Sequence, residues 1–124
     1  MDREKSLIMA LTDKTGATVE VVDEADRPAF VIYEVSEDGQ KKEVGFTQYR
    51  EEGDERVFNH TSVPEEFGGR GLGTIVVAEA MKATAAAGKT VVPVCPMVAG
   101  WLKKNGEDYK AQGGTFRETT PEDH

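Results

Sequence analysis

The sequence predicts an α/β domain of the α+β kind, in which one long and one short helix accompany a mostly antiparallel five-stranded sheet. β-branched runs separated by turn signals fill the first half of the chain. Apolar residues then recur at helical spacing from Leu72 to Ala87. A further β-branched run follows at 90–94, so strand, helix and strand succeed one another. This order implies a right-handed crossover and a parallel pair.

Four strands are expected before the long helix, at 18–22, 29–35, 44–49 and 56–62. The second is apolar on both alternating faces, which is typical of a central strand. Asp38-Gly39 indicates a hairpin turn after it, and the turn at 51–55 contains Gly53. The sequence therefore predicts an antiparallel meander that changes to helix at Pro64.

The second half of the chain contains the two helices and the fifth strand. Gly88 is well placed for the left-handed cap that often ends a helix. Pro93 lacks an amide donor, so the fifth strand lies at an edge or is splayed from its neighbour there. A short helix is expected at 96–104, with Val98, Trp101 and Leu102 on its apolar face.

The length of 124 residues fits one domain. We expect an N-terminal extension at 1–17, the folded domain at 18–110 and a polar tail at 111–124. The tail has too few apolar groups to offset the entropy of ordering it, so we expect it to be flexible.

Charge and cysteine content narrow the class of protein. The formal net charge of -8 disfavours nucleic acid and anionic membranes as partners and weakly favours a cationic amine, although such acidity also serves solubility. The single cysteine excludes an internal disulfide framework, and no zinc-ligand spacing occurs. No apolar stretch is long enough for a signal core or a membrane span. A cytoplasmic protein is expected, with no metal and as a monomer.

Four glycines crowd the turn before the long helix, at positions 68, 69, 71 and 73. The first amides of a helix have no intrahelical acceptor and lie at the positive end of its dipole, so this turn suits a pyrophosphate or another anion. A glycine-rich turn that binds nothing explains the same residues. The Walker lysine is missing, and the dinucleotide glycine spacing is not met.

Several motifs together resemble the small single-domain N-acetyltransferase-like proteins of the GNAT superfamily. They are His60-Thr61-Ser62-Val63-Pro64, Gly69-Arg70-Gly71-Leu72-Gly73, Val92-Pro93-Val94-Cys95-Pro96 and Trp101-Leu102. The likeness covers about residues 19–106. The superfamily loop begins with Gln or Arg, whereas Gly68 stands there in this chain. The resemblance implies that the fourth and fifth strands diverge to form a slot for the pantetheine of acetyl-coenzyme A.

The resemblance also implies a set of site residues. The residues expected to bind acetyl-coenzyme A are Val63, Gly68, Gly69, Arg70, Gly71, Leu72, Gly73 and Thr74. Cys95 would accept the acetyl group or, on the alternative interpretation, is a small buried apolar side chain. His60 would take a proton from the amine, and a hydrogen-bonded strand histidine explains it equally well. Tyr109 is a further candidate acid beyond the matched stretch.

The function that follows is acetyl transfer from acetyl-coenzyme A to the primary amine of a small molecule or peptide. Direct attack of the amine on the thioester is preferred over an acetyl-cysteine route. A non-catalytic acyl-coenzyme A-binding module is the alternative, and a structural domain with an empty loop is a third possibility. The identity of the acceptor amine does not follow from the sequence.

Overall fold

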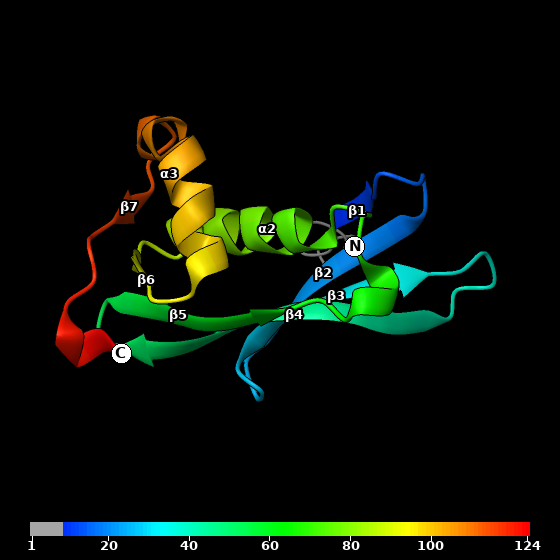
Figure 1. Ribbon diagram of the computed structural model, residues 1–124, viewed down its shortest axis with the longest axis horizontal. Coiled ribbons are helices and arrows are strands. Elements are labelled where there is room, and N and C mark those ends of the chain that lie inside the picture. Colours follow the sequence, from blue (N-terminus) through cyan, green and yellow to red (C-terminus); the bar gives the residue numbers. More distant parts are fainter. Residues whose placement is uncertain (1–8) are drawn as a thin grey trace, which may run out of the picture.

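The computed structural model describes residues 9–124 as a seven-stranded sheet with two α-helices (Figure 1). The strands are β1 (Met9–Thr12), β2 (Thr18–Glu24), β3 (Ala29–Val35), β4 (Lys41–Glu52), β5 (Glu55–Ser62), β6 (Thr90–Pro93) and β7 (Thr115–Phe116). The helices are α2 (Leu72–Ala86) and α3 (Pro96–Ala111), and the two short 3-10 turns are η1 (Glu65–Phe67) and η2 (Pro121–Asp123).

The order of strands in the sheet follows their order in the chain, from β1 to β7. Strands β1 to β5 pair antiparallel, which confirms the predicted meander. Strand β6 pairs parallel to β5 after the crossover through α2, as predicted. Gly39 has a φ of 86° in the turn between β3 and β4, and Gly88 has a φ of 72° after α2, so both expected turn glycines adopt left-handed backbone.

The prediction of five strands is wrong, because β1 and β7 add one strand at each edge. Strand β1 comes from the segment predicted as an extension and pairs with β2. Strand β7 comes from the predicted tail and contributes two residues, paired as Thr90↔Thr115 and Val91↔Phe116. Such short edge strands are stabilised by backbone pairing with a sheet that already exists, so they leave little periodicity in the sequence.

Both helices lie on the same side of the sheet, where they cover the core (Figure 1). Burial of each large apolar side chain in such a core contributes about 1.5–3 kcal/mol. The buried cluster between helices and sheet includes Phe30, Ile32, Val44, Tyr49, Phe58, Leu72, Val76, Val77, Ala80, Met81, Val91, Val98 and Leu102.

Strand β6 pairs along its whole length with the first four residues of β5. The pairing ends at Phe58↔Pro93, followed by a hydrogen bond from the amide of Cys95 to the carbonyl of Phe58 at 2.8 Å. The remaining half of β5 pairs only with β4. Strand β7 pairs only with Thr90 and Val91, so Pro93, the last residue of β6, has no strand partner within the described residues on the side away from β5.

Helix α3 is longer than the predicted short helix and continues to Ala111. A Cβ at Gly106 would lie 2.9 Å from Cζ of Phe116, so the glycine allows β7 to pack against the helix. The hydroxyl of Tyr109 donates to the carbonyl of Met81 at 2.9 Å, which joins α3 to α2. These tertiary contacts extend the helix past a glycine that would otherwise disfavour it.

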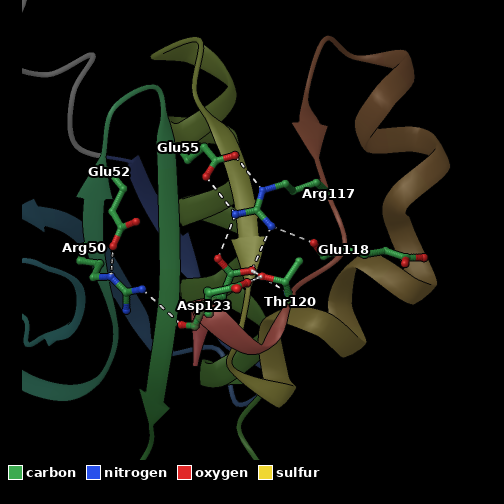
Figure 2. A network of polar contacts seen from close by, with 8 residues as sticks. Arg50, Glu52, Glu55, Arg117, Glu118, Thr120 and Asp123 are labelled. Carbon is green, nitrogen blue, oxygen red and sulfur yellow. Dashed lines mark hydrogen bonds and ion pairs between the residues drawn. The ribbon is translucent and has the colours of Figure 1, made fainter.

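The C-terminal segment lies against the sheet through a network of ion pairs (Figure 2). Arg117 donates to both oxygens of Glu55, at 2.7 and 3.0 Å, and to both oxygens of Asp123, each at 2.9 Å. Arg50 donates to the carbonyl of Asp123 at 3.2 Å. The hydrogen bonds from Arg117 lower the pKa of Glu55 and that of Asp123. The segment predicted as a flexible tail is therefore joined to β4 and β5 by its charged groups.

Candidate functional site

The glycine-rich loop connects η1 to α2. Gly69 and Gly71 have φ values of 79° and 80°, a backbone conformation that side chains other than glycine rarely adopt. Gly71 is the N-cap of α2, and no side chain of the described residues caps the N-terminus of this helix. The loop glycines therefore make the turn possible and leave the helix N-terminus open.

The backbone amides of this loop are its main hydrogen-bond donors. Gly68 donates to the carbonyl of Glu65 at 2.9 Å. Within residues 9–124, the six amides from Gly69 to Thr74 donate to no protein acceptor. The last three belong to the first turn of α2 and lie at the positive end of its dipole. An anion placed there would meet several donors without any side chain.

A pocket of about 270 Å³ opens beside these amides. Its lining consists of Val63, Phe67, Gly68, Gly69, Gly71, Leu72, Gly73, Thr74 and Met97. A Cβ at Gly73 would lie 2.9 Å from Sδ of Met97 and 3.7 Å from Cγ2 of Val63, so the missing side chain keeps this space open. The pocket therefore brings together the end of β5 and the first turns of both helices. Seven of the eight residues predicted to bind the cofactor line it.

The eighth, Arg70, points its guanidinium at two carboxylates of the protein. Its Nε donates to Oδ2 of Asp13 at 2.6 Å, and its Nη1 lies 3.3 Å from Oε1 of Glu34. Burial would raise the pKa of Asp13, but hydrogen bonds from Thr15, Arg70 and the backbone lower that pKa to about 2. Asp13 is thus charged and paired with Arg70. A direct phosphate contact by Arg70 stays a prediction.

Cys95 lies where β5 and β6 part, as the N-cap of α3. Its side chain is buried, and its thiol donates to the hydroxyl of Thr61 at an Sγ–Oγ1 distance of 3.2 Å. The hydroxyls of Thr61 and Thr47 are 2.8 Å apart. Two residues after Cys95, Met97 reaches the loop pocket. The cysteine therefore lies next to the predicted slot, in contact with hydroxyl groups and core side chains.

His60 is not brought to Cys95. His60 and Thr61 are successive residues of β5, paired regularly with Gln48 and Thr47, so their side chains point to opposite faces of the sheet. Since Thr61 contacts Cys95, His60 lies on the other face, where it is exposed and packs edge-on against Phe46 at a centroid distance of 5.8 Å. The catalytic role of His60 stays a prediction that this arrangement does not favour.

Tyr109 belongs to the core, and the partly buried Trp101 packs against it. The Tyr109 hydroxyl already bonds to the backbone of α2, and burial raises its pKa to about 12. Trp101 packs edge-on against Tyr109 at a centroid distance of 5.8 Å. A tyrosine acid at this position would first have to leave its carbonyl partner.

Sequence reasoning missed Met97, Thr61 and Thr47 as neighbours of the site. Thr47 and Thr61 come from adjacent strands, and Met97 follows the crossover. No short motif joins these positions, so only the strand register and the contact between α2 and α3 bring them together.

Neither helix of the described chain has the length and apolarity that crossing a bilayer demands. Across positions 9–124, histidine, cysteine and carboxylate side chains also form no group of three that could hold a metal ion.

A model of the GCN5-related N-acetyl-transferase family matches residues 32–112, about two thirds of the chain. A search of curated proteins finds no significant match. The matched range contains the meander from β3 onward, the glycine-rich loop, both helices and the divergence of β5 from β6. The chain therefore belongs to the GCN5-related N-acetyl-transferase family.

Proposed function

We propose that the chain binds acetyl-coenzyme A and transfers its acetyl group to a primary amine. The observation that supports binding most directly is the run of six amides from Gly69 to Thr74, which have no acceptor among residues 9–124 and lie beside an open pocket. These donors, the helix dipole and the absent side chain of Gly73 fit a diphosphate group.

The main chain of 68–74 would hold the diphosphate. Val63, at the end of β5, would contribute a pocket wall and its amide, which has no acceptor within the described residues. Leu72 is 1% exposed, so it would contribute through its backbone while its side chain anchors α2 in the core. Thr74 is exposed at the pocket and can add a hydroxyl. Binding would thus depend on backbone geometry more than on particular side chains.

When bound, acetyl-coenzyme A supplies an acetyl group activated as a thioester. The protein would orient that group beside Cys95, where β5 and β6 part, and orientation alone can supply much of the acceleration. Direct attack by the amine is the preferred route, because the Cys95 thiol is buried and already bonded to Thr61. His60 is the proposed base only if the amine approaches from the exposed face of the sheet.

A non-catalytic acyl-coenzyme A-binding module is the second candidate. The separation of His60 from Cys95 by the sheet favours it, because a base within reach of the reacting atoms is what general-base catalysis needs. Both candidates share the same binding loop and differ in whether the thioester is cleaved.

The test is a titration of the labelled protein with coenzyme A, followed by amide resonances. We expect the resonances of residues 69–74 to shift most, and no shift anywhere would overturn the proposal. Acetyl-coenzyme A is then incubated with the protein and a panel of primary amines. Release of free coenzyme A supports the enzyme, whereas binding without release for every amine leaves the module.

Intact-mass measurement decides the route through Cys95. Exposure to acetyl-coenzyme A should add one acetyl group to the wild type and none to Cys95→Ala if the cysteine is acetylated. If neither protein gains mass, and Cys95→Ala still acetylates amines, the amine attacks the thioester directly.

A further inference from the structure

The turn between β1 and β2 is fastened to the glycine-rich loop. The amide of Lys14 donates to the carbonyl of Arg70 at 3.0 Å, and Nε of Arg70 donates to Oδ2 of Asp13 at 2.6 Å. These two bonds run in opposite directions between the same two segments, which lie 56 or more positions apart in the sequence. The turn is therefore held directly against the glycine-rich loop.

Asp13 makes this turn rigid. Its side chain is 0% exposed, and its Oδ1 accepts from the amide of Thr15 at 2.8 Å, the hydroxyl of Thr15 at 2.7 Å and the amide of Ala17 at 3.0 Å. A buried carboxylate with this many donors is costly to move. The position of Lys14 relative to the loop is thus set by the fold rather than by a mobile surface segment.

The side chain of Lys14 lies along Gly71. A Cβ built on Gly71 would lie 3.3 Å from both Cγ and Cε of Lys14, so the aliphatic stem covers the N-cap of α2. The ammonium group is bonded to Cε and is therefore close to the helix N-terminus. The lysines that form ion pairs within residues 9–124 are Lys41, Lys82 and Lys89, and Lys14 is not among them.

A cation at this loop would favour the binding of a phosphorylated ligand for an electrostatic reason. The formal net charge of -8 opposes the approach of a phosphorylated ligand. Arg70, the loop's own cation, is paired with Asp13 and Glu34. Lys14 is a basic residue that the fold places against Gly71, whose amide has no acceptor within residues 9–124.

We propose that Lys14, from the turn between β1 and β2, is a phosphate-binding residue of the coenzyme A site. The inference rests on the proposed function and adds a residue far from the glycine-rich motif in sequence. Its ammonium would contact a phosphate group of the bound ligand, while the loop amides hold the diphosphate. The turn thereby makes the N-terminal segment part of the binding site.

Calorimetry with coenzyme A tests this assignment on the full chain. Lys14→Met keeps the aliphatic stem against Gly71 and removes only the charge, whereas Lys14→Arg keeps the charge. Lys82→Met is the matched control, because Lys82 is an exposed lysine on the later turns of α2. We expect Lys14→Met to weaken binding about fivefold, as for loss of one exposed ionic contact. Lys14→Arg should restore most of the affinity, and Lys82→Met should bind as the wild type does.

Salt dependence separates a phosphate contact from a structural effect. The difference between wild type and Lys14→Met should nearly vanish in 1 M salt, where the screening length is about 3 Å. A difference that persists there would mean that the substitution altered the loop, which would overturn the inference.

The 3′-dephospho form of coenzyme A then identifies the phosphate. If wild type and Lys14→Met bind that ligand with equal affinity, Lys14 contacts the 3′-phosphate. If the difference in affinity persists, Lys14 contacts the diphosphate, and both results support the assignment. Equal coenzyme A affinity of wild type and Lys14→Met would overturn the role of Lys14 alone. Absence of binding to the wild type would overturn the proposed function itself.

Discussion

The thiol of Cys95 donates a hydrogen bond to the hydroxyl of Thr61 across the point where β5 and β6 part. Thr61 is also bonded to Thr47, which is 0% exposed, so three side chains share one chain of hydrogen bonds. The cysteine is thereby held in a defined position at the N-terminus of α3. The arrangement predicts coupling among these three residues.

Thr61→Val should lower the free energy of unfolding by about 1–2 kcal/mol, because it leaves the buried hydroxyl of Thr47 without this partner. Thr47→Val with Thr61→Val removes both hydroxyls, so the double variant should be more stable than the sum of the single effects implies. Urea unfolding of the wild type and the three variants measures the coupling. Strict additivity would show that the hydroxyl pair does not contribute to stability.

Gly73→Val should weaken coenzyme A binding about tenfold or more, because its side chain would enter the space between Met97 and Val63. The protein should stay folded, since Met97 is 45% exposed and its terminal atoms can shift. Gly100→Val is the control, because a Cβ at Gly100 meets nothing within 4 Å. Calorimetry checks both variants, and an unchanged affinity of Gly73→Val would place the ligand elsewhere.

Asp13→Asn should lower stability at neutral pH by about 1–3 kcal/mol, because it removes the charge that pairs with Arg70 and replaces the Oδ2 acceptor by an amide NH2 that faces the Nε donor of Arg70. The pKa of Asp13 is lowered to about 2 by the fold, against an ordinary value near 3.8. The contribution of its charge to stability is therefore fully present above pH 4 and is lost as the pH falls toward 2.

Urea unfolding of wild type and Asp13→Asn between pH 2 and pH 7 checks this dependence. The stability difference between the two proteins should be constant above pH 5 and should shrink below pH 4. A difference that stays constant down to pH 2 would mean that Asp13 is not the titrating group.

Arg117→Gln should speed amide exchange in the C-terminal segment, because Arg117 joins Glu55 to Asp123 (Figure 2). The amide of Arg117, which donates to the carbonyl of Val91 at 3.1 Å, is the most direct probe. Arg27→Gln is the matched control, since it breaks an exposed ion pair with Glu43 elsewhere in the sheet. Hydrogen exchange that is equally slow in wild type and Arg117→Gln would show that backbone pairing alone retains the segment.

The sequence predicted the parts of the fold that depend on local patterns. The β-branched runs located β2 to β6, and helical spacing from Leu72 located α2. The prediction from sequence missed β1, β7 and the second half of α3. These elements are stabilised by neighbours distant in sequence, as the contact of Gly106 with Phe116 shows.

The features of the candidate site also divide into those that local sequence predicted and those that depend on distant neighbours. The glycine spacing alone indicated an open helix N-terminus, and the unpartnered amides from Gly69 to Thr74 are consistent with it. The orientation of His60 away from Cys95 depends on the register of β5 against β4, which no motif specifies. The pairing of Arg70 with Asp13 depends likewise on the turn between β1 and β2.

By itself the sequence determined the antiparallel meander, the crossover helix, the glycine-rich turn and the resemblance to N-acetyltransferases, because each follows from residues close together in the chain. Tertiary structure alone decided the width of the sheet, the length of α3, the surroundings of Cys95 and the position of Lys14 against Gly71. The physical reason is that strand register and helix packing are set by the sum of many weak contacts between distant segments, which no single stretch of sequence contains.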